Sequence, residues 1–194
     1  ALVLYFLDSR ELLGVSIWEK PLKFLISSAI YGATFSWFYS LAEKAQKAAR
    51  RLGNAIAVLL AIELVVIIGL AAAGYTSHFN VSSGFLTFTW SVMATAISMV
   101  WMATFGIGAL IWRTSQTSSL IRAGIRWGVA TSLFGMGIAF TMTSPTSDQL
   151  DDYQGIAGAH TVGATDGGEG LPFLGWSTVA GDLRISHFFG LHAL

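Results

Sequence analysis

The sequence predicts an all-α fold, a polytopic bundle of transmembrane helices with about four complete and two partial spans. Composition is the first reason: apolar residues make up 54% of the 194 residues and charged residues only 11%, which is unusual for a soluble domain. The second reason is that the apolar residues gather in runs of roughly 20, the length needed to cross a ~30 Å hydrocarbon core. Charged loops separate these runs.

The predicted elements follow one another as a single membrane domain. Residues 1–7 are interpreted as the end of one partial span and residues 186–194 as the beginning of another, so at least six spans are expected in all. Complete spans are expected at residues 24–42, 54–74, 88–112 and 125–143. Residues 8–23 form a first outer loop. Residues 144–185 form a long, glycine-rich outer loop whose apolar run, residues 171–176, is expected to fold back over the bundle.

The basic residues predict the orientation of the bundle. Seven of the eleven lie in two loops at one end, residues 43–53 and 113–126. They are Lys44, Lys47, Arg50, Arg51, Arg113, Arg122 and Arg126. Because cytoplasmic loops carry an excess of Lys and Arg, we expect both loops in the cytoplasm and the protein in the cell membrane.

The net charge and the composition also limit the classes of partner and of chemistry that the chain can have. A net charge of zero gives no indication of a nucleic-acid partner, so the expected partners are lipid and either other membrane proteins or further copies of the chain. The absence of cysteine excludes disulfides, iron–sulfur clusters and thiolate zinc sites. No Walker A or Rossmann glycine pattern is present. No catalytic residue can be assigned, and whether the chain is an enzyme stays open.

Four histidines provide the first candidate site, because all of them fall in the predicted outer half. They are His78 beyond the second complete span, His160 in the long loop, and His187 and His192 in the last partial span. Imidazole is the commonest metal ligand, binds haem iron and titrates near neutral pH. We expect a polar site, supported by Asn80 and Asp166, that binds a metal ion or haem. The alternatives are that these histidines cap helix ends or take part in proton transfer.

Glu63 is the second candidate site, because it lies roughly 15 Å from either end of its predicted span. An ionisable side chain at this depth is costly and commonly marks an ion or proton path. No Lys or Arg lies at comparable depth in the complete spans. We therefore expect a neutral carboxyl group that faces the bundle interior and bonds to a hydroxyl such as Thr95 or Ser98.

Glu63 supports an alternative function, a transporter or channel in which this residue relays protons or ions across the membrane. A third interpretation, a structural subunit of a larger membrane assembly, requires no site at all. The sequence by itself does not decide among the three.

Three segments resemble a family of bacterial multi-pass membrane proteins without an assigned activity. They are Asp8-Ser-Arg-Glu-Leu-Leu-Gly with Trp18-Glu-Lys-Pro-Leu-Lys-Phe24, then Ser77-His-Phe-Asn80, and Gly181-Asp-Leu-Arg-Ile-Ser-His-Phe-Phe-Gly-Leu-His192. The resemblance covers most of the chain and agrees with a location in a bacterial inner membrane. It implies no catalytic residue, cofactor or substrate.

Overall fold

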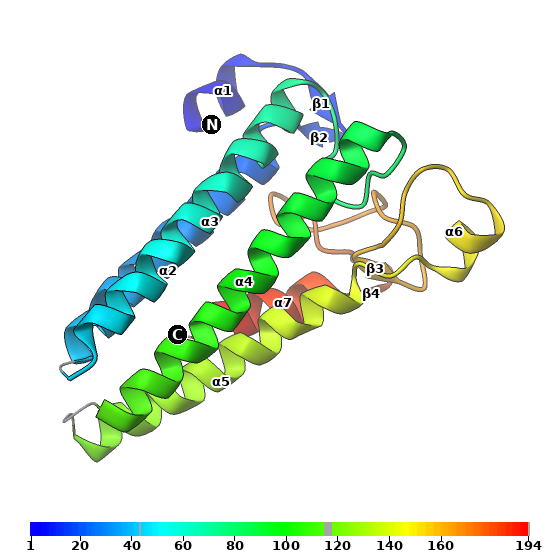
Figure 1. Ribbon diagram of the computed structural model, residues 1–194. Coiled ribbons are helices and arrows are strands. Elements are labelled where there is room, and N and C mark those ends of the chain that lie inside the picture. The colour runs from blue at the N-terminus through cyan, green and yellow to red at the C-terminus, as the bar shows by residue number, and fades with distance from the viewer. Residues whose placement is uncertain (43, 115–117, 194) are drawn as a thin grey trace.

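The computed structural model describes residues 1–42, 44–114 and 118–193, and most of these residues are helical (Figure 1). The helices are α1 (Leu2–Leu7), α2 (Glu19–Leu41), α3 (Gln46–Ala72), α4 (Gly84–Thr114), α5 (Ser119–Thr141), α6 (Ser147–Asp151) and α7 (Leu183–Leu191). Two small antiparallel sheets join β1 (Glu11–Leu12) to β2 (Val15–Ser16) and β3 (Thr161–Val162) to β4 (Gly181–Asp182). The predominance of helix that the sequence predicts is confirmed.

The four long helices run up and down beside one another. Helix α3 packs against α2 and α4, while α5 packs against α4 and α7 (Figure 1). Both sheets, α6 and the turn between α3 and α4 gather at one end of the bundle, which we call the loop end. The opposite end holds the connections from α2 to α3 and from α4 to α5. We call it the basic end, because Lys44, Lys47 and Arg113 lie there.

Two of the long helices are sufficiently long and apolar to cross a membrane. Among the described residues these are α3 and α4, with mean hydropathies of 2.8 and 1.7 over their most apolar windows. Helices α2 and α5 occupy the other two predicted complete spans but do not reach the same apolarity. Serine, threonine, glycine and tyrosine residues are interspersed among their apolar ones. Length and composition therefore support two of the four predicted complete spans.

Helices α3 and α4, which pack against each other, each carry a buried stripe that repeats every seven residues. The stripe on α3 is Ala49, Ile56, Glu63 and Leu70, and the stripe on α4 is Leu86, Met93, Val100 and Ile107. A seven-residue repeat keeps one face of each helix toward its neighbour, as in a coiled coil. Glu63 lies within this stripe and is only 4% exposed, whereas Val65 is 71% exposed. The predicted inward orientation of Glu63 is confirmed.

The helices begin earlier than predicted wherever charged residues were assigned to loops. Helix α2 begins at Glu19 rather than residue 24, because Pro21 fits in a first turn whose N–H groups lack helical partners. Glu19 and Lys23 then pair across one turn at 2.6 Å. Helix α5 begins at Ser119, where the Ser118 hydroxyl accepts a hydrogen bond from the Ile121 N–H.

The loop predicted at residues 43–53 is also shorter in the structure, because helix α3 already includes residues 46–53. Glu43, residues 115–117 of the loop predicted at 113–126, and Leu194 of the last partial span lie outside the described residues. The basic residues at positions 47, 50 and 51 therefore lie on the first turns of α3.

The predicted long loop, residues 144–185, carries secondary structure of its own. Thr146 and Gln149 form a reciprocal capping box at the start of α6. The apolar run of the long loop, residues 171–176, contacts α2. Lys23 Nζ donates to the Leu174 carbonyl at 3.2 Å and lies 5.2 Å from the centre of the Phe173 ring. The loop is thus held against the bundle rather than extended from it.

Helices α5 and α7 cross at two glycines. A Cβ atom placed on Gly135 would lie 2.6 Å from the Gly190 Cα atom, so only glycine fits at this crossing. The close approach lets the Ser132 hydroxyl donate to the Leu191 carbonyl at 3.4 Å. In a membrane, where water does not drive helices together, such small-residue contacts are a main source of helix association.

Candidate polar site at the loop end

The turn after α3 carries His78 and is hydrogen-bonded to the long loop that carries His160. Gly74 ends the helix at a φ of 80°, a left-handed conformation that glycine adopts readily, and the Tyr75 N–H donates to the Leu70 carbonyl at 2.9 Å. The chain then runs back across the loop end, where the Phe79 carbonyl accepts a hydrogen bond from Ala157 at 2.8 Å. This contact ties the segment of His78 to the long loop.

His78 lies in an aromatic environment. Its ring centre is 5.6 Å from that of Phe24 and 5.4 Å from that of Trp90, and Ser77 Oγ is hydrogen-bonded to its Nδ1 at 3.0 Å. Burial lowers the pKa of His78 well below its ordinary value, and positive charge on Lys20, His160 or His187 would lower it further. The ring is therefore neutral at pH 7.

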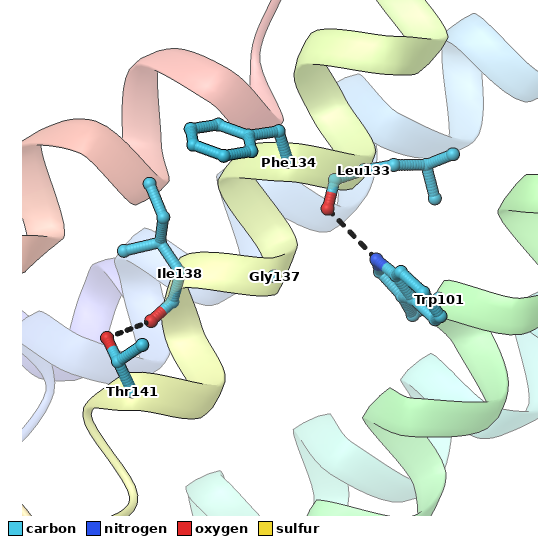
Figure 2. Close-up of a pocket in the computed structure, with 6 residues that line it drawn as sticks. All are labelled: Trp101, Leu133, Phe134, Gly137, Ile138 and Thr141. Carbon is cyan, nitrogen blue, oxygen red and sulfur yellow. Dashed lines mark hydrogen bonds between the residues drawn. The ribbon is translucent and has the colours of Figure 1, made fainter.

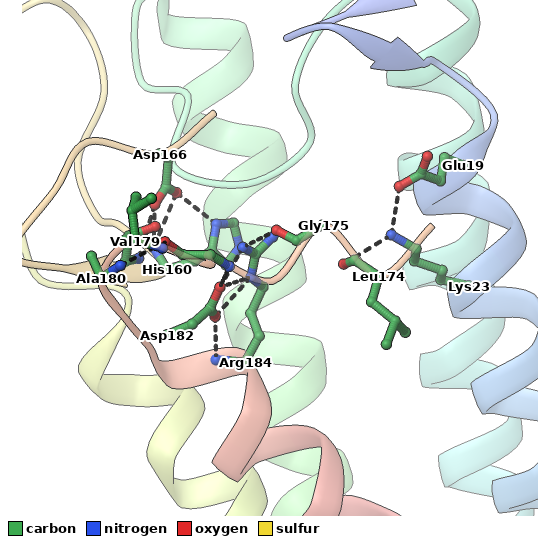
Figure 3. Close-up of polar contacts among 12 residues, drawn as sticks. Glu19, Lys23, His160, Asp166, Leu174, Gly175, Val179, Ala180, Asp182 and Arg184 are labelled. Atoms are coloured by element: carbon green, nitrogen blue, oxygen red, sulfur yellow. Dashed lines mark hydrogen bonds and ion pairs between the residues drawn. The ribbon is translucent and has the colours of Figure 1, made fainter. Parts of the chain in front are cut away.

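His160 and Asp166 form a directly bonded pair (Figure 3). Nδ1 of the ring lies 2.6 Å from Asp166 Oδ2, and the carboxylate also accepts the backbone N–H groups of His160 and Thr161. Burial opposes charge on Asp166, but these hydrogen bonds hold its pKa well below the usual range. Burial lowers the pKa of His160 and outweighs the bond to Asp166. At pH 7 a neutral imidazole thus donates to a carboxylate, which leaves Nε2 as an acceptor.

A second ion pair holds the start of α7 beside this one. Arg184 lies 2.5 Å from Asp182 and also donates to the Gly175 carbonyl at 2.5 Å (Figure 3). Asp182 caps α7 by accepting the Arg184 N–H at 2.9 Å. Burial opposes charge on Asp182, but the hydrogen bonds from Arg184 and from Ser177 lower its pKa. Both acids of this region are therefore satisfied by partners within the protein.

The remaining predicted site residues make structural contacts. His187 Nδ1 donates to the Gly135 carbonyl at 2.8 Å, and His192 Nε2 lies 3.1 Å from the Ser27 hydroxyl, so both fasten α7 to neighbouring helices. Asn80 accepts hydrogen bonds from Ser82 in its own turn. His78, His160 and His187 do lie within electrostatic range of one another. Three of the four predicted histidines thus gather at the loop end.

No metal-binding arrangement is formed by these residues. Within residues 1–42, 44–114 and 118–193, no three His, Asp or Glu side chains are placed to hold one ion. The Nδ1 atoms of His78, His160 and His187 are each already in a hydrogen bond. Only their Nε2 atoms are left for another ligand.

Glu63 lacks the hydroxyl partner that the sequence predicts. Its Oε2 atom is buried without a hydrogen bond. Thr95 and Ser98 instead donate to carbonyl groups of their own helix, those of Ser91 at 2.8 Å and Ala94 at 2.7 Å. Serine and threonine in helices commonly bond back to the preceding turn, and this competes with bonds between helices.

Lys20 is a charged residue of this region that the sequence analysis did not single out. It was assigned to an outer loop, but it lies in the first turn of α2 and interacts electrostatically with Glu63. The sequence predicts no Lys or Arg at the depth of Glu63 within the complete spans, and Lys20 lies outside the span predicted at residues 24–42. Pro21 was the available signal, because a proline so close to a span is typical of the first turn of a helix.

Lys20 also lies within electrostatic range of residues from the loops and from α7. We use the name polar cluster for Lys20 together with side chains that interact electrostatically with it or with His78. Its members are Lys20, Glu63, His78, His160, Asp166 and His187.

No family model, curated protein or solved structure matches this chain. The resemblance to a bacterial multi-pass family therefore stays a prediction. Any functional conclusion has to rest on the geometry and charge of the chain itself.

An apolar groove lies between α4 and α5. It measures about 520 Å³. Its lining residues are Trp101, Leu133, Phe134, Gly137, Ile138 and Thr141 (Figure 2). The Trp101 indole N–H donates to the Leu133 carbonyl at 2.9 Å and so closes one side of it. The groove contains no ionisable group and offers no acid–base chemistry.

Proposed function

We propose that this chain is a multi-pass integral membrane protein in which the polar cluster accepts protons at the loop end and relays them to Glu63. The outward surfaces support a lipid environment, because large apolar side chains are exposed along three helices. Examples are Val58, Ile62, Val65, Phe88, Met99, Met102, Phe105 and Phe134. Soluble monomers rarely expose continuous apolar surface on this scale. In this proposal α2 and α5 complete a set of four spans.

The proposed orientation places the basic end in the cytoplasm. That end carries the seven basic residues that the sequence analysis identified, and the Arg126 guanidinium lies 4.1 Å from the centre of the Trp112 ring. Arginine and tryptophan together are typical of the membrane–water interface, and the excess of basic residues favours the cytoplasmic side. In this orientation the polar cluster lies on the outer side of the membrane.

One observation carries the proposal of a proton relay: Glu63 is buried, lacks a hydrogen bond at Oε2 and interacts with Lys20. Glu63 lies nine residues before the end of α3, about 14 Å from the loop end. Neutral His160 and His78 belong to segments at the loop end, and each has a ring nitrogen that can accept a hydrogen bond. A carboxyl group at this depth with a titratable path above it is the arrangement that proton-translocating proteins use.

Proton flux in reconstituted vesicles tests the proposal. The purified protein is placed in liposomes that contain a pH-sensitive dye, and a potassium diffusion potential drives protons inward. We expect flux above that of empty liposomes and a reduction of about tenfold or more in Glu63→Gln, since an amide neither binds nor releases a proton at this site. The matched control is Glu169→Gln, an exposed acid of the long loop, which should leave flux unchanged. Equal flux in wild type, Glu63→Gln and empty liposomes would contradict the proposal.

A metal ion or haem is the second candidate. No three side chains of the described residues are placed to hold one ion, but His78, His160 and His187 each use Nδ1 in a hydrogen bond and leave Nε2 for a ligand. Elemental analysis and an absorption spectrum of the same purified protein distinguish the two candidates. A colourless sample without bound metal would remove the second.

A further inference from the structure

We propose that the basic end binds the phosphate groups of anionic phospholipids in the cytoplasmic leaflet of the membrane. This inference rests on the proposed membrane location and orientation, but it is independent of the proton relay. The residues that bind the lipid lie near the connections from α2 to α3 and from α4 to α5, at the opposite end of the bundle from the loop end (Figure 1).

The charges of the chain are divided unevenly between its two ends. Residues 42–53 and 112–126 at the basic end carry seven basic residues against one acid, Glu43, which gives a formal charge of +6. Residues 1–23 and 144–185 carry four basic residues against nine acids, which gives −5. The net charge of zero for the whole chain therefore conceals one strongly cationic end, and an anionic partner is expected there.

The basic residues of the two ends also differ in their pairing. Three of the four at the loop end form ion pairs with carboxylates of the chain, namely Arg10, Lys23 and Arg184. The basic-end residues that form no ion pair within the described parts of the chain are Lys44, Lys47, Arg50, Arg51, Arg113 and Arg126. The positive charge of the basic end is thus left for a partner from outside the chain.

The first turn of α3 borders an open hollow of about 550 Å³. Its lining residues are Lys44, Ala45, Gln46, Lys47 and Ala48. Lys44 and Lys47 are both exposed. Ala45 precedes the helix and provides no side-chain cap, and the first turn contains no acidic residue that would compete for the two ammonium groups. An anionic headgroup can therefore approach both lysines without repulsion from α3.

Arg126 provides a second phosphate contact beside an exposed aromatic ring. Its guanidinium group lies 4.1 Å from the centre of the Trp112 ring, and Trp112 is 58% exposed. Its Nε atom is buried and has no hydrogen bond within the described residues. Stacking on the indole ring fixes the plane of the guanidinium group, and a fixed guanidinium binds phosphate oxygens with little loss of side-chain entropy.

The hollow and the Arg126–Trp112 pair belong to the same packed end of the bundle. Ala49, in the first turn of α3, is a member of the same buried cluster as Ile111 and Ile125. These two isoleucines directly precede Trp112 and Arg126 in the sequence. Tryptophan is typical of the membrane–water interface, where phospholipid headgroups are the abundant anions, and clusters of about four to eight basic residues beside a span commonly bind anionic lipid.

A lipid titration of the purified protein in detergent micelles, read by native mass spectrometry, tests this inference. Dioleoylphosphatidylglycerol is the anionic probe and zwitterionic dioleoylphosphatidylcholine is the reference. We expect wild type to bind phosphatidylglycerol about tenfold or more tightly than phosphatidylcholine, and both Lys44→Gln/Lys47→Gln and Arg126→Gln to lose most of this preference, since positive charge is removed from the basic end. The matched control, Arg10→Gln/Lys23→Gln, removes two cations from the loop end and should keep the wild-type preference.

The outcomes separate this inference from the proposed function. Equal binding of the two lipids by wild type would overturn it, and so would an equal loss of preference in the control variant. Inorganic phosphate at the concentration of the lipid should leave the lipid adducts in place, and their complete displacement would show a site for free phosphate instead. Lipid preference without proton flux would contradict the relay alone, whereas flux without lipid preference would contradict the lipid site alone.

Discussion

Replacement of Glu63 by lysine is expected to prevent assembly of the helix bundle. Position 63 lies in the buried stripe between α3 and its neighbours, 4% exposed, and interacts with the ammonium group of Lys20. A lysine there would bury a positive charge within electrostatic range of Lys20, in a helix that the proposed function places in the membrane. Insertion of a charged residue near the centre of a membrane helix costs about 3 kcal/mol before this repulsion is added. We therefore expect little folded protein.

The yield of monodisperse protein after membrane extraction measures this effect. Gel filtration in mild detergent should show a single species for wild type and Glu63→Gln, since glutamine keeps the shape of the side chain without its charge. Glu63→Lys should be aggregated or absent from the membrane fraction. Equal yields of wild type and Glu63→Lys would show that position 63 is not enclosed by the bundle.

An alanine in place of Gly135 is expected to displace α7 from the bundle. Its Cβ atom would lie 2.6 Å from the Gly190 Cα atom and 2.8 Å from the Leu191 backbone nitrogen, too close for either helix to stay in place. The hydrogen bond from His187 to the Gly135 carbonyl would be strained by the same shift. Overpacking of this kind costs about 1–3 kcal/mol and exceeds the gain in helix propensity of about 1 kcal/mol from glycine to alanine.

Thermal unfolding and hydrogen exchange give the readouts for this substitution. Gly135→Ala should lower the unfolding temperature and increase exchange in residues 183–191. Gly137→Ala is the matched control in the same helix, because a Cβ atom at Gly137 would meet no atom within 4 Å. It should leave both readouts unchanged or slightly improved. If the amide hydrogens of α7 exchange equally slowly in Gly135→Ala and Gly137→Ala, the close crossing of α5 and α7 is contradicted.

The sequence predicts the helical class and the inward orientation of Glu63 because both depend on local quantities. Apolar runs predict helices, and the cost of an exposed acid at that depth predicts burial. The sequence predicts later starts for α2 and α3 than the structure shows, because charged residues are typical of loops. Lys20 and Lys47 lie in helical turns near the ends, where long side chains can extend toward water.

The candidate site was predicted only in part, for a related reason. The location of His78 and His160 at the same end follows from the alternation of loops, and the structure places them within electrostatic range. The direct bond between His160 and Asp166 depends on a turn of six residues that no periodicity predicts. The interaction of Lys20 with Glu63 depends on the register of two helices, which composition alone does not fix.

Thiol labelling of single-cysteine variants tests the membrane topology on which the account depends. The chain has no cysteine, so Gln46→Cys at the basic end and Gly168→Cys in the long loop each introduce one unique reactive site. Both positions are exposed. An impermeant thiol reagent added to intact cells should label Gly168→Cys at once and Gln46→Cys only after the membrane is permeabilised. Equal labelling of the two variants from outside intact cells would contradict the account.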